Sequence, residues 1–175
     1  MNKKIDYFDT LLPGPMIVVC KDDAGIWPGY DENCEVSGVI PAVQIPIEER
    51  TKTIDLQGIG FFLISEAGPI SAYVAGDEVI LGIWFTVEEG TDPNTATLQS
   101  ILSQGVAINP PWPEDEVSFR SNCISLWSAC EAGGNNPNQV HIGPIRPGNY
   151  RVAVRTWELK NAASCVVAHF KKLIA

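Results

Sequence analysis

The sequence predicts an all-β protein, a single-domain β-sandwich of roughly nine strands with one short helix over about residues 93–104. Short β-branched and aromatic runs recur along the chain, separated by turn residues. The 15 glycines and 13 prolines are spread throughout the chain, as in a loop-rich β protein. One segment, about residues 93–104, is flanked by residues that are typical of the start and the end of a helix. A chain of 175 residues fits one domain, which we expect to span residues 1–175.

The strands expected in the first half are Met16–Cys20, Thr51–Leu56, Ile59–Ser65, Ile70–Ala75 and Glu78–Val87. Segment 36–45 is also apolar, but Pro41 and Pro46 restrict it to an edge strand or an irregular segment. The turn residues Gly76 and Asp77 predict a hairpin between the last two strands. In residues 78–87, alternation places Val79, Leu81, Ile83, Phe85 and Val87 on one face, and Ile80 and Trp84 on the other. Because both faces are apolar, this strand should be central or covered on both sides.

The helix is expected between Asp92 as its cap, Pro93 at its first position and Gly105 as its stop. Its apolar face would consist of Leu98, Ile101 and Leu102. After it we expect a stiff extended loop over 109–116 and a strand over 117–127. A flexible loop over 131–138, a short strand over 140–142 and a last strand over 163–172 should follow.

A turn formed by Pro147, Gly148 and Asn149 leads into a strand whose two faces differ in character. Alternation places Tyr150, Val152, Val154 and Thr156 on one face, and Arg151, Ala153, Arg155 and Trp157 on the other. The first set is typical of a core face. The second carries two guanidinium groups and an indole, so we expect it to be solvated or covered by a partner.

Charge is distributed unevenly around a net charge of −9. Residues 1–119 contain 5 basic and 19 acidic residues, whereas residues 120–175 contain 7 basic and 2 acidic residues. Because an acidic protein repels nucleic acid, we expect no nucleic-acid partner. The acidic part could attract a basic protein, or it could serve solubility alone.

The cysteines and the first residues predict a cytoplasmic protein with no membrane partner. Met1-Asn-Lys-Lys is not followed by the apolar run of a signal peptide, and no apolar stretch approaches the ~20 residues of a membrane helix. The five cysteines include no C-x-x-C pair. This usage favours buried, inert thiols in a reducing compartment.

The sequence contains no recognisable catalytic or cofactor motif, so we expect no enzyme activity and no cofactor. There are two histidines, His141 and His169. On a strand, Cys165 and His169 would lie roughly 13 Å apart, too far for a catalytic pair. The six residues between Cys123 and Cys130 match no common zinc pattern. Adjacent acidic pairs favour solvated turns, although calcium binding and a glycosidase-like pair of distant acids stay open.

The candidate interaction residues are therefore on surfaces. Proline-braced loops carry the aromatic residues Trp27, Tyr30 and Trp112, the last followed by Glu114, Asp115 and Glu116. Loop aromatics are typical anchors of binding sites, but they also fold back to plug a sandwich. The third candidate is the face formed by Arg151, Arg155 and Trp157, or these arginines simply pack over an aromatic ring.

The run Val140–Trp157 resembles the late strands of the competence-associated nuclease-inhibitor proteins of bacteria. The run Ile17–Asp23, a β-branched strand followed by acidic residues, is loosely similar to that family as well. Together the resemblance covers about a fifth of the chain, and no functional residue is carried over from it. It implies a small acidic cytoplasmic β protein that blocks a partner nuclease.

From these observations we expect a non-enzymatic binding protein, an inhibitor or immunity-type partner of a basic protein such as a nuclease. Two alternatives stay open. The first is a small-ligand or carbohydrate-binding sandwich that uses Trp27, Tyr30 or Trp112 as a stacking platform. The second is a structural subunit of a homo-oligomer with an interface at Trp157.

Overall fold

The computed structural model describes residues 3–8, 15–29, 51–66, 68–88, 92–108, 113–160 and 163–174, with the backbone alone for residues 3–8 and residue 86. In this part of the chain, twelve strands form two antiparallel sheets, accompanied by one α-helix and one 3-10 helix. The predicted all-β sandwich with one short helix is therefore confirmed, with more strands than expected. The segment 36–45 lies outside the described residues. No helix in the described part is long and apolar enough to cross a lipid bilayer.

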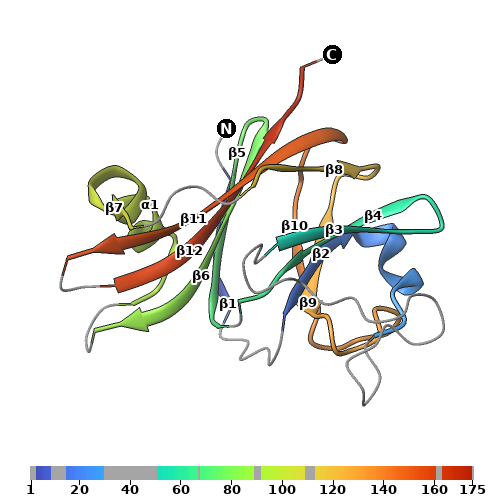
Figure 1. The fold of residues 1–175 in the computed structure, drawn as a ribbon, viewed down its shortest axis with the longest axis horizontal. Coiled ribbons are helices and arrows are strands. Elements are labelled where there is room, and N and C mark those ends of the chain that lie inside the picture. The colour runs from blue at the N-terminus through green and yellow to red at the C-terminus, as the bar shows by residue number, and fades with distance from the viewer. Residues whose placement is uncertain are drawn as a thin grey trace.

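Sheet A has seven strands in the order β1-β5-β6-β12-β11-β7, with β8 pairing to the same edge of β11 as β7 (Figure 1). Its strands are β1 (Lys3–Phe8), β5 (Ile70–Ala75), β6 (Glu78–Val87), β7 (Val106–Ala107), β8 (Asp115–Phe119), β11 (Gly148–Leu159) and β12 (Ala163–Lys172). Sheet B has the order β10-β9-β2-β4-β3. Its strands are β2 (Met16–Cys20), β3 (Thr51–Leu56), β4 (Ile59–Ile64), β9 (Ile124–Ser128) and β10 (Val140–Ile142). The helices are η1 (Lys21–Ile26) and α1 (Thr95–Gln104).

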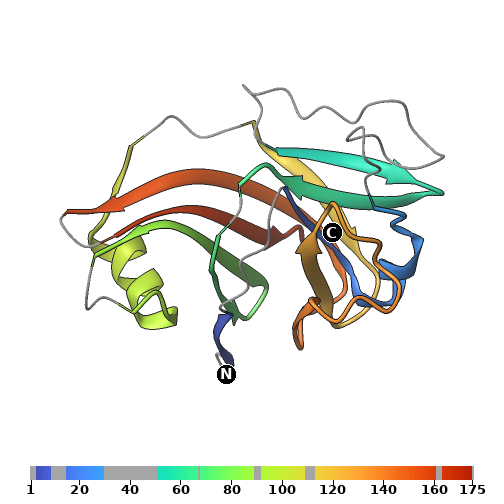
Figure 2. The same cartoon turned by 90° about the horizontal axis from the view of Figure 1, so that it is seen from below.

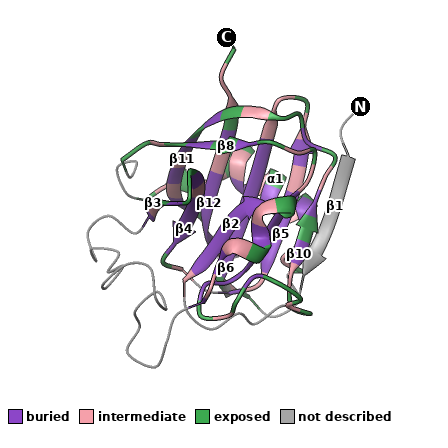
Figure 3. Ribbon diagram, turned by 90° about the vertical axis from the view of Figure 1, so that its right-hand side faces the viewer, coloured by how far each residue is buried: buried purple, intermediate pink, exposed green. Residues whose placement is uncertain are grey.

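The main core lies between the facing sides of the two sheets, whose strands are mostly buried (Figure 3). Phe62 of sheet B meets Phe170 of sheet A edge to face, with ring centroids 5.5 Å apart. The predicted core face of β11 is confirmed, because Tyr150, Val152, Val154 and Thr156 are each at most 4% exposed. Burying such apolar side chains contributes about 1.5–3 kcal/mol each, which makes this interface the main source of stability.

A second core lies on the outer face of sheet A, where α1 covers one end of the sheet (Figure 2). Leu98 of α1 sits directly over Gly82 of β6. A Cβ added at Gly82 would lie 2.7 Å from Leu98 Cδ1, so glycine lets the helix approach the sheet. The buried members of this cluster are Ile80, Trp84, Leu98, Ile101, Ala163, Cys165 and Val167. As predicted, β6 is therefore covered on both faces.

The predicted N-terminus of the helix is wrong by two residues, and the cap is Asn94 instead of Asp92. The Asn94 side chain accepts hydrogen bonds from the backbone amides of Ala96 and Thr97. Asp92 contributes its backbone carbonyl, which accepts the hydroxyl of Thr97. Both asparagine and aspartate cap helices well, so the sequence pattern alone did not separate them. The predicted stop at Gly105 is confirmed.

The predicted faces of β6 fail at its end because the strand contains a β-bulge. Cys165 pairs with Trp84, but the preceding Ser164 pairs with Thr86, so Phe85 is the extra residue. The bulge shifts the alternation by one position, and Val87 joins the helix-covered cluster instead of the main core. Phe85 is 45% exposed.

The single strand predicted over 117–127 is two strands in different sheets. Strand β8 pairs with β11 in sheet A, whereas β9 pairs with β2 and β10 in sheet B. Between them the chain crosses from one sheet to the other, and the carbonyl of Asn122 accepts the amide of Ile145. Continuous apolar patterning does not reveal such a crossing, because both strands bury residues in the same core.

The loop over 131–138, predicted to be flexible, is anchored by side-chain hydrogen bonds. The Glu131 carboxylate accepts the side-chain amides of Asn136 and Asn138, at 2.7 and 3.2 Å. Its backbone carbonyl accepts Nε1 of Trp127 at 2.9 Å. These hydrogen bonds brace the loop and tie its start to β9.

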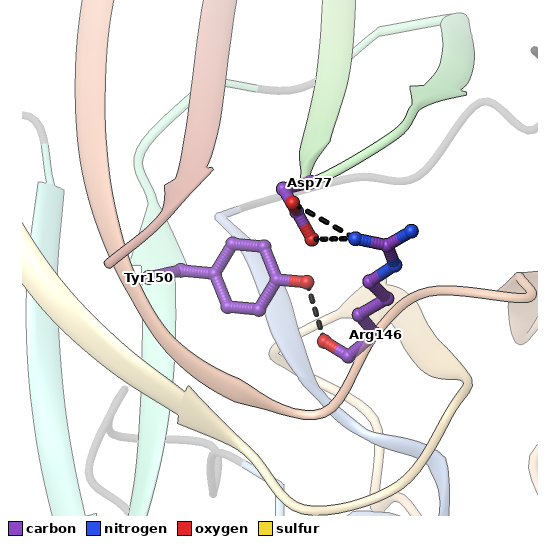
Figure 4. Close-up of polar contacts among 3 residues, drawn as sticks. All are labelled: Asp77, Arg146 and Tyr150. Atoms are coloured by element: carbon purple, nitrogen blue, oxygen red, sulfur yellow. Dashed lines mark hydrogen bonds and ion pairs between the residues drawn. The ribbon is translucent and has the colours of Figure 1, made fainter. Parts of the chain in front are cut away.

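The turn predicted at Pro147, Gly148 and Asn149 is wrong, because Gly148 and Asn149 already pair with β8 as the first residues of β11. The segment before β11 is instead held against a neighbouring hairpin (Figure 4). The Tyr150 hydroxyl donates to the backbone carbonyl of Arg146, four residues upstream, at 2.5 Å. The Arg146 guanidinium contacts both carboxylate oxygens of Asp77, at 3.1 and 3.0 Å. Burial, with a smaller contribution from Asp77, raises the pKa of Tyr150. The tyrosine therefore stays a neutral donor and holds the segment before β11 against the β5–β6 hairpin.

A candidate interaction face on sheet A

Two sets of residues that are distant in sequence meet on the outer face of sheet A. Strand β8 pairs with β11 so that Glu116 stands directly opposite Arg151. The Nε atom of Arg151 lies 3.5 Å from Oε2 of Glu114, and its Nη2 atom lies 3.9 Å from Oε1 of Glu116. The loop predicted over 109–116 ends earlier, because Asp115 and Glu116 belong to β8. The acidic segment and the basic strand, separate candidates in the sequence, are thus one surface.

The same register continues across the next two strands. Arg151 stands opposite Lys171 of β12, which in turn stands opposite Glu78 of β6. The Lys171 Nζ atom lies 3.8 Å from Oε1 of Glu78. We call Glu116, Arg151, Lys171 and Glu78 the charged row. Its two central cations are direct cross-strand neighbours and would repel each other, and the flanking carboxylates offset that repulsion.

A hollow of about 430 Å³ adjoins the charged row. The small side chain of Ala153 leaves room between Arg151 and the His169 that stands opposite Ala153 on β12. The Nε2 atom of His169 lies 3.2 Å from Oε2 of Glu78, so the histidine lies beside the carboxylate that also faces Lys171. The lining residues are Glu114, Arg151, Ala153, His169, Lys171, Lys172, Leu173 and Ile174.

Asp115 differs from its two acidic neighbours because its side chain supports the fold. Its Oδ2 atom accepts the hydroxyl of Thr53 on β3, and its Oδ1 atom accepts the backbone amide of Glu116 at 2.8 Å. Asp115 thereby ties β8 of sheet A to sheet B. Glu114 and Glu116 remain exposed on the surface.

The other members of the basic face lie nearer to the helix. Trp157 is partly buried and packs against the helix-covered cluster. Arg155 is partly buried and stands opposite the buried Val167 on β12. The three residues proposed together from sequence therefore divide between the open and the helix-covered halves of one face.

Trp27 lies in the core, where it is 1% exposed. Its Nε1 atom donates to the carbonyl of Ala129 at 2.8 Å, and its ring centroid lies 5.4 Å from that of Phe61. The loop therefore folds back as a plug, one of the two readings that the sequence allowed, and Trp27 presents no stacking surface. Tyr30 and Trp112 lie outside the described residues.

The structure also reveals a Ser125–His141 pair that sequence reasoning missed. The two residues stand opposite each other on β9 and β10, with Ser125 Oγ 2.7 Å from His141 Nδ1. Burial, and to a lesser degree Lys21, lowers the pKa of His141. Ser125 is 0% exposed, so no substrate reaches its hydroxyl and the pair does not form a nucleophilic site.

The described cysteines differ in exposure. Cys20 and Cys165 are buried, as predicted, and burial raises the pKa of Cys165 to about 12. The prediction of burial is wrong for Cys130, which is exposed on the turn after β9. Among the described residues, no group of three or more His, Cys, Asp or Glu side chains is placed to hold a metal ion.

Comparisons with protein-family models, with curated proteins and with solved structures gave no match to this chain.

Proposed function

We propose that this protein is a non-enzymatic binding protein that recognises another protein through the charged row and the adjoining hollow. The observation that carries the proposal is the registered order Glu116, Arg151, Lys171 and Glu78 across four paired strands. Backbone hydrogen bonds of the sheet fix the spacing of these charges. A partner therefore meets a preorganised charge pattern, the property that gives protein interfaces their specificity.

The charge of the whole chain favours a basic partner. With a net charge of −9, the protein attracts a basic protein over distances comparable to the Debye length, and the exposed Glu114 and Glu116 supply acidic contacts. A basic nuclease is the class that the resemblance of Val140–Trp157 implies. The protein would then act as an inhibitor or immunity-type partner.

A second candidate function is the binding of a small ligand, which the size of the hollow favours. Its volume of about 430 Å³ lies in the range of small-molecule sites. The charged side chains at its rim favour a polar ligand. The stacking platform predicted from the sequence is a separate route to a carbohydrate ligand, and glycan-array binding that disappears in Trp112→Ala would support it in place of a protein partner.

The protein-binding proposal is tested by capturing partners from the native host with the tagged protein and its charge-reversal variants. Glu114→Lys and Glu116→Lys should each weaken capture by about tenfold, because each places a cation against a basic partner. Asp115 is left intact because it binds Thr53. Asp22→Lys is the matched control, since it makes the same charge change at an exposed residue beside sheet B. Partner capture that is equal in all variants would contradict the proposal.

A further inference from the structure

The end of sheet A next to α1 exposes large apolar side chains on the face opposite the helix. Phe85, Val106 and Ile108 are 45%, 68% and 50% exposed. This end of the sheet extends beyond sheet B, which covers the other end (Figures 1 and 2). Exposed apolar residues that share one face mark a contact surface more often than residues scattered singly over the surface do.

The strand register places these side chains on one face. Glu158 continues the inward-facing series of Tyr150, Val152, Val154 and Thr156, and it stands opposite Val106 on β7. Ile108 is two residues after Val106, so its side chain lies on the same face. Its amide donates to the carbonyl of Thr156 at 3.1 Å. Before the bulge, Phe85 follows the inward-facing series of β6. We call Phe85, Val106, Ile108 and Glu158 the distal face.

Phe85, the unpaired residue of the bulge, forms the second apolar edge of the distal face. A regular β6 would pair Phe85 with a residue of β12, whereas the bulge leaves it unpaired and exposed. Phe85 on β6 and the pair on β7 are separated by three strand spacings, about 14 Å, and the residues between them are the small Ser164 of β12 and Glu158 of β11. An α-helix with its side chains is about 10–12 Å wide, close to the separation of these two edges.

The charge of the distal face indicates which kind of helix would bind there. Glu158 is exposed on the distal face and makes no ion pair with any residue in the described part of the chain. A second copy of this chain would bring a second net charge of −9 and a second Glu158 to the contact. A basic partner instead gains both long-range attraction and a local ion pair.

We propose that the distal face binds an amphipathic helix of a basic partner, whose apolar stripe contacts Phe85, Val106 and Ile108 and whose lysine or arginine pairs with Glu158. The inference rests on the proposed function only in assigning a protein partner. The distal face lies on the opposite side of sheet A from the charged row, so each surface can be tested without the other.

The test is titration of the ¹⁵N-labelled protein with a synthetic amphipathic helix of leucine and lysine, followed by NMR. We expect amide shifts at residues 84–87, 106–108 and 156–158. Phe85→Ser combined with Ile108→Ser should weaken binding by about tenfold or more. Glu158→Lys should also weaken it, whereas Glu114→Lys, on the opposite side of the sheet, should leave the same dissociation constant to within about twofold.

Several results would overturn the proposal. These are the absence of shifts at the highest soluble peptide concentration, shifts confined to the charged row, and equal binding of a peptide with glutamate in place of lysine. An unchanged dissociation constant in the double variant would do the same.

Sedimentation showing a dimer that the double variant dissociates would assign the face to a second copy. Thermal melting checks that the variants fold, and Val106→Glu, at the most exposed of the three positions, repeats the test with one substitution.

Discussion

The outer face of sheet A has two halves that are built from the same strands and differ in chemistry. Towards one end, β6 and β12 present Trp84, Cys165 and Val167, all buried beneath α1. Towards the other end, the same strands with β11 present Glu78, Lys171 and Arg151, which are open to solvent. Because side chains alternate along a strand, all six of these side chains lie on the outer face of sheet A. The docking of α1 decides which of them become core, and the comparison teaches that one face can supply both stability and recognition.

The largest expected effect comes from removing the helix contact over Gly82. Leu98 is 0% exposed, so Leu98→Ala leaves a cavity between α1 and the sheet and should lower the free energy of unfolding by about 3 kcal/mol. Leu102→Ala is the matched control, because Leu102 is only partly buried and should cost clearly less. Urea unfolding measures both. Equal losses would show that the covered half does not depend on this contact.

The next effect tests whether Gly82 is required for docking. Gly82→Ala places a methyl group 2.7 Å from Leu98 Cδ1 and should destabilise the protein by about 1–3 kcal/mol. Gly60→Ala is the control in β4, since its Cβ would lie 3.5 Å from Thr53 Cγ2, an ordinary contact. Combining Gly82→Ala with Leu98→Ala should cost less than the sum of the two, because the cavity accepts the methyl group. Additive losses would contradict direct contact.

The thiol of Cys165 reports on the covered half through pH. Its pKa of about 12 in the folded protein lies above that of an unfolded cysteine, near 8.5. Below about pH 8.5 the thiol is protonated in both states, and the free energy of unfolding does not depend on its titration. As the pH rises from there towards 12, the unfolded chain loses the proton first, so the free energy of unfolding falls by about 1.4 kcal/mol per pH unit. Urea unfolding at pH 8 and pH 10 should show a smaller loss for Cys165→Ala than for the unmodified chain. Equal losses would mean that solvent reaches the thiol.

The smallest effect is expected in the open half. Arg151 and Glu114 have side chains 53% and 57% exposed, so their ion pair contributes little to stability. Arg151→Ala should change the free energy of unfolding by less than about 0.5 kcal/mol, in low salt and in high salt. A loss of several kcal/mol in a denaturation experiment would show that the charged row is a structural element and would weaken its assignment as an interaction face.

Local patterning predicted much of the fold. Several strand boundaries agree with the structure, including Thr51–Leu56, Ile70–Ala75 and Glu78–Val87. The core face of β11 follows from alternation alone, because residues of one parity must share a face. The bulge at Phe85 was not predictable in this way, since one unpaired residue depends on the register between β6 and β12.

The candidate site was predictable only as separate pieces. Glu114, Glu116 and Arg151 each stood out as charged residues, but β8 and β11 are about thirty residues apart in the chain. Their pairing is a long-range contact that no local pattern encodes. Trp27 shows the opposite case, because a loop tryptophan flanked by proline and glycine looks the same whether it anchors a partner or fills the core.

By itself the sequence determined the β class, the short helix, most strand limits and the two-faced character of β11, because these depend on backbone preferences and on the two-residue period of a strand. Only the tertiary structure decided which outward residues α1 covers, where charges from four strands line up and which aromatic residues are buried. Those outcomes depend on the pairing of distant strands, which is set by burial over the whole molecule and by close approaches such as that of Leu98 to Gly82.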